Sequence, residues 1–194
     1  LCMASAVTAY YDAFGSDGPP PTYADIGEAD VHLIWGANPA AAHPVMFRWI
    51  RRRSEDGRLI VVDPVESETA EHADLHVRPE PGTDLALARA VLAHLVETGG
   101  IDRAFVDRYT EGFDALVADL PDADGATATA GVARDTVATV ADAFDERTLV
   151  YWGMGVNQST QGTATAGALI DLCLATGNMG EGRGPFSLTG QANS

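Results

Sequence analysis

Short apolar runs, each closed by a turn residue, mark the predicted strands in the first half of the chain. Residues 31–35 form such a run before Gly36, and residues 59–62 form another before Asp63 and Pro64. Residues 75–77 form a third and shorter run. Uninterrupted apolar runs of this length are typical of strands that are buried on both faces of a parallel sheet.

Helical spacing of apolar residues follows two of these runs. A helix is predicted from about Pro44, with Val45, Met46, Trp49 and Ile50 on its apolar side. A second helix is predicted to begin near Asp84, because residues 81–84 have the composition of a turn and a helix N-cap. Two glycines after residue 98 end it.

The second half repeats this order after a stretch of short helices. The predicted elements are helices at 102–109, 113–120 and 133–144, a loose linker at 121–130, a strand at 149–152, a loop at 153–162, a buried helix at 163–176 and a glycine-rich tail at 177–184. We therefore divide the chain into a first α/β unit at 1–120, a linker and helix at 121–147, and a second α/β unit at 148–194. The predicted fold is α/β, with a Rossmann-like parallel sheet and flanking helices.

Strand-loop-helix units of this kind bind nucleotides at the carboxyl ends of the strands. However, no G-x-G-x-x-G follows the first strand, and the chain contains no G-x-x-x-x-G-K-[ST]. An ordinary dinucleotide or P-loop site is therefore not supported. Spacing alone predicts a nucleotide-binding type of α/β domain without naming its ligand.

The charge balance is acidic, with 28 Asp and Glu against 12 basic residues in 194, and every basic residue is arginine. A net charge of −16 opposes nucleic-acid binding, since phosphate contacts need clusters of Lys and Arg. The one such cluster, residues 51–53, is followed by Glu55 and Asp56 and is interpreted as a solvated helix face. A lysine-free, aspartate-rich composition suggests adaptation to high salt.

Cysteine content and hydropathy favour a reducing, cytoplasmic compartment. The two cysteines, Cys2 and Cys173, lie far apart, and no apolar run reaches the length of a membrane span. No signal peptide is visible, although the chain opens without an initiator methionine and stops in a glycine-containing loop. We therefore expect an internal piece of a larger, multi-domain protein.

Seven segments together resemble the molybdopterin oxidoreductase (DMSO reductase) family. They are LCMASAV (1–7), DGPPPTYADI (17–26), WGANPAAAHP (35–44), VVDP (61–64), RPEPGTDLAL (78–87), GMGVNQSTQGT (153–163) and TGNMGEGRGPFSLTGQAN (176–193). Within the last segment, GPFSLTGQ resembles the nitrate reductase branch, of assimilatory or periplasmic type. The resemblance runs through the whole chain, which matches only the middle of a longer family polypeptide.

The resemblance implies a molybdenum centre held by two molybdopterin guanine dinucleotides. Cys2 would supply the thiolate that ligates molybdenum, and Met154 and Gln158 would lie beside the metal and the second pterin. The remaining implied cofactor contacts are Trp35, Gly36, Ala37, Asn38, Pro39, Ala40, Ala41 and Ala42 on one pterin nucleotide, and Asp63, Pro64, Gly82, Thr83 and Asp84 toward its ribose and base.

Elementary chemistry is consistent with these assignments. Soft sulfur donors stabilise a metal that changes oxidation state, and a strand-end carboxylate such as Asp63 accepts hydrogen bonds from ribose hydroxyls or guanine N–H groups. Gly36 and Gly82 would let the backbone approach a diphosphate. One departure weakens the match: Val65, Glu66 and Ser67 stand where the family commonly has arginines and a threonine.

Several of these residues also have a purely structural interpretation. Cys173 lies in an apolar helix and is expected to be core. His43 precedes a proline at a helix start, so a capping or structural role is favoured over a catalytic one. Met154 is as consistent with packing as with a metal pocket. Trp35 and Trp152 end strands in equivalent places, so core or loop support is as good an interpretation as cofactor stacking.

The implied activity is reduction of nitrate to nitrite by two-electron oxygen-atom transfer. Electrons would come from a donor such as ferredoxin or an NAD(P)H-linked reductase, through a [4Fe-4S] cluster upstream of this chain. One alternative is a formate dehydrogenase of the same family. The other is a non-catalytic relative that serves as a scaffold in an electron-transfer complex; Cys2 argues against it, because a scaffold has no use for a metal ligand.

Overall fold

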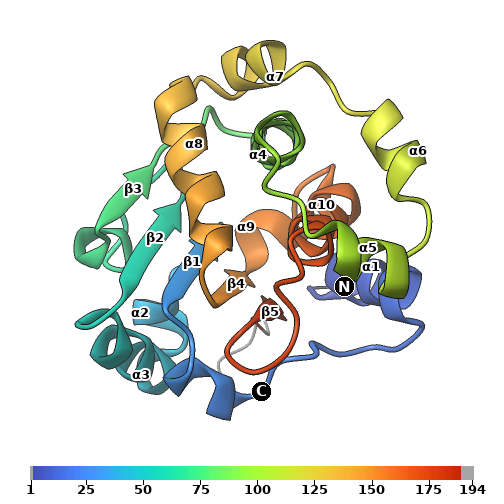
Figure 1. The fold of residues 1–194 in the computed structure, drawn as a ribbon. Coiled ribbons are helices and arrows are strands. Elements are labelled where there is room, and N and C mark those ends of the chain that lie inside the picture. The colour runs from blue at the N-terminus through green and yellow to red at the C-terminus, as the bar shows by residue number, and fades with distance from the viewer. Residues whose placement is uncertain (1, 189–194) are drawn as a thin grey trace.

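A single five-stranded parallel sheet forms the centre of the computed structural model, which describes residues 2–188 (Figure 1). The strands are β1 (Val31–Trp35), β2 (Arg58–Val62), β3 (Leu75–Val77), β4 (Thr148–Trp152) and β5 (Gly184–Ser187), in the order β3-β2-β1-β4-β5. Trp35 at the end of β1 lies opposite Val62 on one side and Trp152 on the other. The carboxyl ends of the three central strands therefore share one edge of the sheet.

Every residue of β1 and β4 is buried, and most are apolar, because both faces of the sheet are covered. Alternate residues of β1 enter two different cores: Leu33 and Trp35 face the larger core, and Ile34 faces the smaller one. The larger core is shared with α1, α4, α7, α8 and α10, whereas the smaller core is shared with η1 and α3. In Figure 1, α2 and α3 accordingly lie at the lower left, opposite α1 and α5.

The helices connect and cover the strands. They are α1 (Ala4–Phe14), η1 (Tyr23–Gly27), α2 (Pro39–Ala42), α3 (Pro44–Ser54), η2 (Ala70–His72), α4 (Asp84–Thr98), α5 (Arg103–Tyr109), α6 (Phe113–Ala118), α7 (Ala123–Ala130), α8 (Arg134–Asp142), η3 (Ala143–Asp145), α9 (Met154–Asn157) and α10 (Gly162–Ala175). The predicted α/β class, the strands at 31–35, 59–62, 75–77 and 149–152, and the helix from residue 84 are confirmed. Strands from the 1–120 and 148–194 units pair in the same sheet.

Three local expectations are wrong. The linker predicted at 121–130 contains α7, which begins where the Asp122 carboxylate accepts a hydrogen bond from the Gly125 amide at 2.7 Å. The loop predicted at 153–162 contains the short helix α9. The Thr83 hydroxyl does not cap α4, because it donates to the carbonyl of Glu80 at 2.6 Å instead.

The orientation of α3 also differs from its predicted apolar side. Met46 and Ile50 are buried as expected, together with Phe47, but Val45 and Trp49 are exposed. The buried stripe is therefore rotated around the helix relative to the one that the sequence pattern indicated.

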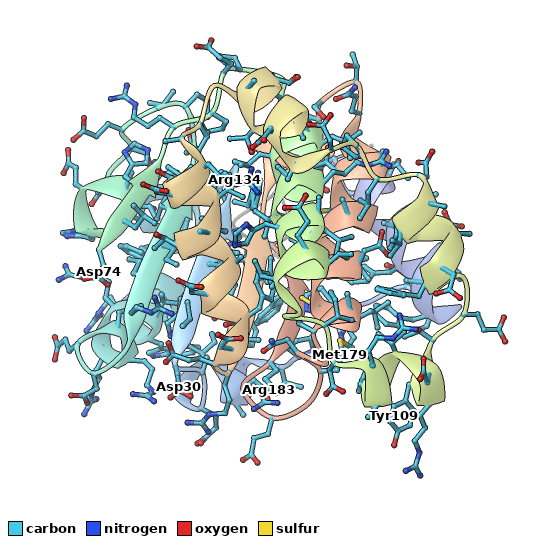
Figure 2. All side chains as sticks on the ribbon, turned by 45° about the horizontal axis from the view of Figure 1, so that its top comes forward. Asp30, Asp74, Tyr109, Arg134, Met179 and Arg183 are labelled. Atoms are coloured by element: carbon cyan, nitrogen blue, oxygen red, sulfur yellow. The ribbon has the colours of Figure 1, made fainter. Side chains whose placement is uncertain are left out.

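An ion cluster fixes the amino end of the sheet, opposite the candidate site. Asp30, which immediately precedes β1 and is labelled in Figure 2, accepts hydrogen bonds from Arg53 at 2.8 Å and from Arg147 at 2.8 and 2.9 Å. The hydrogen bonds from Arg147, followed by the charges of both arginines, hold the pKa of the Asp30 carboxyl below its usual value. Among residues 2–188, no helix is both long and apolar enough to cross a membrane.

Candidate functional site

A cavity of about 290 Å³ opens at the carboxyl ends of β1, β2 and β4. The loops after these strands form its walls, as in other open parallel α/β sheets, where this edge is the usual ligand site. Several predicted contacts line it together, namely Gly36, Ala37, Asn38, Pro39, Ala41, Ala42, Asp63 and Met154. Residues far apart in the sequence thus meet where a nucleotide was expected.

Glycines allow the loops after β1 and β4 to touch through their backbones. Gly155 donates its amide to the carbonyl of Gly36 at 2.9 Å, and Gly36 has a φ of +56°. A methyl group on Gly155 would lie 2.7 Å from that same carbonyl oxygen, and one on Gly153 would lie 2.8 Å from the side chain of Ala37. Contact between loops therefore requires these glycines, quite apart from any approach to a diphosphate.

Thr69 holds the loop after β1 in place, and sequence reasoning did not identify it. Its side chain is fully buried, and its hydroxyl donates to Asn38 Oδ1 at 2.7 Å while accepting from the Ala40 amide at 3.0 Å. Thr69 therefore fixes the Asn38 amide group in the wall of the cavity. No pattern in the sequence marks this residue, because its partners lie 31 and 29 positions away.

Asp63 presents a half-buried carboxylate to the cavity. Its Oδ1 accepts a hydrogen bond from the Val65 amide at 2.8 Å, the only such bond to this carboxylate from any described residue. Burial raises the pKa of the Asp63 carboxyl, and the hydrogen bond from Val65 offsets part of that rise. A carboxylate that is partly desolvated and has one oxygen available is suited to accept N–H or O–H groups of a ligand.

The strand-end tryptophan has no exposed surface. Trp35 is completely buried, and its indole N–H donates to Asp84 Oδ1 at 2.9 Å. The Trp35 side chain therefore positions the first residue of α4 rather than facing a ligand. Gly82 adopts a φ of +85° in the turn before α4.

Seven predicted cofactor contacts fall outside the lining of this cavity. They are Trp35, Ala40, Pro64, Gly82, Thr83, Asp84 and Gln158. Glu66, which departs from the family pattern, is exposed and lies 4.0 Å from Arg78 in an ion pair. The negative charge that Glu66 adds to this loop is thus partly balanced by a neighbouring cation.

The N-terminal segment packs beside α9 through Asn157, another residue that sequence reasoning missed. Asn157 donates to Met3 Sδ at 3.5 Å, and its carbonyl accepts from Ser5 Oγ at 2.7 Å. Its Oδ1 also accepts from the Trp152 indole at 3.1 Å. Cys2, partly buried in the turn before α1, precedes Met3, and the exposed Gln158 follows Asn157, so each of the two predicted residues is next to a member of this contact in the sequence.

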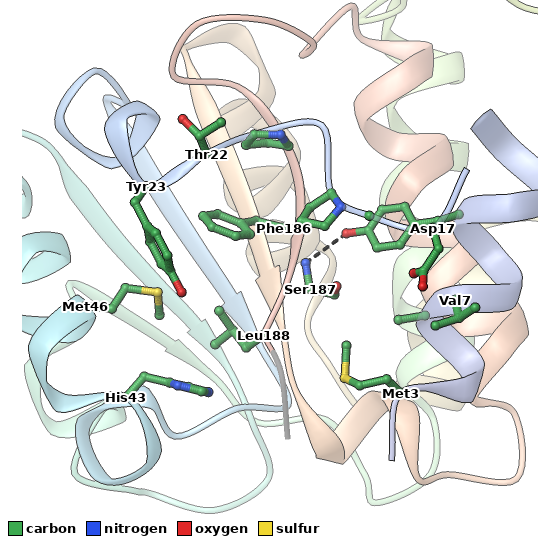
Figure 3. A pocket seen from close by; sticks show the side chains of 15 residues that line it. Met3, Val7, Asp17, Thr22, Tyr23, His43, Met46, Phe186, Ser187 and Leu188 are labelled. Carbon is green, nitrogen blue, oxygen red and sulfur yellow. Dashed lines mark hydrogen bonds between the residues drawn. The ribbon is translucent and has the colours of Figure 1, made fainter. Parts of the chain in front are cut away.

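A second cavity, of about 450 Å³, lies between α1, the segment 17–23 and β5 (Figure 3). Met3, Tyr10, Phe186 and Leu188 are among the residues that line it. The Tyr10 hydroxyl also accepts from the Ser187 amide at 2.9 Å. Because Met3 lines its wall, this cavity lies next to Cys2.

His43 and Leu188 line both cavities. His43 occupies the N-cap position of α3, but its imidazole makes no capping hydrogen bond there, so of the two roles expected for it side-chain capping is wrong. Figure 3 shows this side chain directed toward Leu188. Residues 189–193, the second half of the GPFSLTGQAN motif, lie outside the described residues.

Within residues 2–188, no three His, Cys, Asp or Glu side chains come together in a way that could hold a metal ion. Cys173, the second thiol, is fully buried in α10, where burial raises its pKa far above the usual value.

The model of the molybdopterin oxidoreductase family matches residues 1–194, and the chain belongs to that family. It is 68% identical over its full length to the assimilatory nitrate reductase of Haloferax mediterranei, and 41% identical to a nitrate reductase of Synechocystis. It spans only 27% and 28% of those two proteins. Acetylene hydratase from Pelobacter acetylenicus has a similar fold, with a TM-score of 0.83 and 21% identity over 94% of this chain and 25% of the hydratase.

Proposed function

We propose that this chain is the part of a nitrate reductase catalytic subunit that binds one nucleotide of a bis-molybdopterin guanine dinucleotide cofactor. The observation that carries this proposal is the 68% identity to an assimilatory nitrate reductase across all 194 residues. The proposed reaction consumes nitrate, two protons and two electrons and yields nitrite and water. The bound cofactor supplies the redox chemistry, and the protein positions and tunes it.

The cavity at the sheet edge fits the nucleotide end of such a cofactor. Backbone from Gly36 to Ala42 is held open by the glycine contacts and by Thr69, and the Ala37 and Asn38 amides donate to no residue within 2–188. Such amides suit a diphosphate. We assign the ribose or guanine to Asp63, with Pro64 beside it, because its carboxylate has an oxygen available.

The other proposed cofactor contacts lie in segments that adjoin the cavity or contribute to its wall. Gly82, Thr83 and Asp84 form the turn that opens α4, and Trp35 fixes Asp84 there, so we propose them as the outer support of the nucleotide site. Cys2 is the proposed thiolate ligand of molybdenum. Met154 and Gln158 are proposed to contact the reacting end of the cofactor, since α9 packs against the segment that carries Cys2.

The parts of the reaction outside this chain follow from electron balance. Two electrons must reach the metal, so we propose a [4Fe-4S] cluster elsewhere in the polypeptide and a donor such as ferredoxin or an NAD(P)H-linked reductase. Assimilation of nitrate implies a cytoplasmic enzyme. Formate oxidation is the alternative reaction of the family, and the identity to nitrate reductases favours nitrate.

Activity of the full-length polypeptide tests the proposal directly. Purified with its cofactor and supplied with a reduced viologen dye, it is expected to form nitrite from nitrate, whereas formate with oxidised dye is expected to give no reduction. Formate-dependent dye reduction without nitrite formation would identify the enzyme as a formate dehydrogenase. A preparation that retains molybdenum but catalyses neither reaction would support a scaffold.

Replacing Asp63 with asparagine is expected to weaken cofactor retention. The amide keeps an oxygen for the Val65 amide but loses the charge that strengthens ligand hydrogen bonds, a loss of about 1–2 kcal/mol. Molybdenum and guanine nucleotide released per polypeptide measure the effect. Asp74→Asn is a matched control, because that carboxylate also accepts a backbone amide, from Leu59 at 2.8 Å, at the opposite end of β2. Equal cofactor loss in both variants would refute the assignment.

A further inference from the structure

The outward side of α3 carries an unusual combination of residues. Val45, Arg48, Trp49 and Arg52 follow the i, i+3, i+4, i+7 spacing of one helix face, and Tyr23 of η1 lies beside them. The rings of Tyr23 and Trp49 meet edge to face, with their centroids 6.1 Å apart. We call these five residues the α3 stripe. It lies at the outer edge of the molecule in Figure 1, on the face of the sheet opposite α10.

Exposed apolar surface is concentrated on the α3 stripe. Tyr23 and Val45 are each 60% exposed, and Trp49 is 48% exposed. They are three of the six large apolar side chains exposed among residues 2–188, and the other three, Tyr11, Val65 and Tyr109, lie on separate elements. A groove of about 610 Å³ is lined by Tyr23, Trp49 and Arg52 of the stripe, and also by Arg53 and one carboxylate, Asp56. A contiguous apolar patch rimmed by polar groups marks an interaction surface.

The charge of the α3 stripe opposes that of the rest of the chain. Four of the twelve arginines in a chain of net charge −16 lie on α3. Arg53 is paired with Asp30, but Arg48 and Arg52 form no ion pair with any residue in the described range 2–188. Attraction to the helix C-terminus accounts for arginines in the last turn. It accounts neither for Arg48, one turn earlier, nor for the exposed aromatic pair.

We propose that the α3 stripe docks an acidic segment of a separate protein, with an apolar side chain of that partner inserted between Tyr23 and Trp49. Carboxylates of the partner would pair with Arg48 and Arg52, because a guanidinium group can bind a carboxylate through two parallel hydrogen bonds. Tryptophan, tyrosine and arginine are the residues that dominate binding energy at interfaces. A small patch with charged residues at its rim suits a transient partner better than a permanent interface, whose core is larger and more apolar.

A nucleic acid is a poorer occupant of the same surface. Only two unpaired arginines lie on the stripe, and a molecule of net charge −16 repels a phosphate backbone over its remaining surface. A short acidic peptide segment meets the positive patch without extending over the negative surface around it. The inference does not depend on the proposed nitrate reduction, because it concerns a face of the fold remote from the sheet edge.

The test uses a fluorescein-labelled peptide of glutamates with a central Leu-Phe pair. Its binding to the full-length polypeptide is measured by fluorescence anisotropy. Saturable binding is expected, and it should weaken as added salt shortens the Debye length from about 10 Å to about 3 Å. The double variant Arg48→Glu/Arg52→Glu should weaken binding about tenfold or more. Trp49→Ala should also weaken it without changing the charge.

Arg108→Glu is the matched control, because Arg108 is an arginine next to an exposed aromatic ring on another face, 5.2 Å from the centroid of Tyr109. It should leave peptide binding unchanged. The proposal is overturned if the peptide does not bind, if Arg108→Glu weakens binding as much as the α3 variants, or if a peptide of glutamates alone binds equally well. Tighter binding of single-stranded DNA than of the peptide would assign the stripe to nucleic acid instead.

Discussion

Replacing Cys2 with serine in the full-length polypeptide is expected to abolish nitrate reduction while much of the cofactor stays bound. Serine exchanges a soft, polarizable thiolate for a hard alcohol that stays largely protonated at neutral pH, so the proposed metal ligand is lost. The proposed nucleotide contacts of the sheet-edge cavity should remain, because their residues lie in the loops after β1 and β2. Nitrite formation and molybdenum content, measured on the same preparation, separate loss of chemistry from loss of cofactor.

Cys173→Ser provides the control for this experiment. Cys173 is fully buried in α10 among core residues, so serine there costs packing stability of about 1 kcal/mol or somewhat more and leaves activity in the folded fraction. The thermal midpoint should therefore fall in Cys173→Ser and stay nearly constant in Cys2→Ser. If Cys2→Ser kept full activity and Cys173→Ser were inactive, Cys173 and not Cys2 would be the metal ligand. The alignment of the seven motifs with the family would then also be wrong.

Gly155→Ala is expected to separate the two loops that form the proposed nucleotide cavity. The added methyl group would lie 2.7 Å from the Gly36 carbonyl oxygen and 2.9 Å from the Gly36 Cα atom, and both are backbone atoms that cannot rotate away. The hydrogen bond from Gly155 to Gly36 would break with this movement. Overpacking of this kind costs about 1–3 kcal/mol. Cofactor content should fall steeply, because the contact orders one wall of the cavity.

Gly167→Ala tests whether the effect is specific to that contact. Gly167 lies inside α10, and a methyl group there meets no atom within 4 Å. Alanine is a better helix former than glycine by about 1 kcal/mol, so Gly167→Ala should raise the thermal midpoint and leave cofactor content unchanged. If Gly155→Ala also retained a normal cofactor content and midpoint, the loop contact would be unimportant for the site.

The strands and the edge of the sheet that forms the candidate site could be predicted from the sequence. Predominantly apolar runs at 31–35, 59–62 and 149–152 are a local signal, because strands covered on both faces are buried at nearly every position. The turn residues that follow them indicate where each strand ends, and parallel strands place those ends together. Gly36 and Asp63 were therefore correctly expected at one edge.

Helix α7 shows where that local signal fails. Its sequence of alanine, threonine, aspartate and glycine has no large apolar residue, so the pattern resembled a linker. Ala126 and Ala130 are nevertheless buried in the larger core, where small side chains allow close packing against α4. Val45 and Trp49 show the opposite error, since apolar residues at helical spacing were assigned to the core and lie at the surface.

The sequence by itself determined the class of fold, the strand ends that carry the site and, through seven ordered motifs, the family. Only the tertiary structure decided which of the candidate residues meet. Asn157 bonds to Met3 across 154 positions, Thr69 orients Asn38, and Trp35 points into the core to hold Asp84. Each of these contacts joins segments whose separation along the chain carries no periodic signal, because the distance between them is fixed by how strands and helices pack and not by local backbone preference.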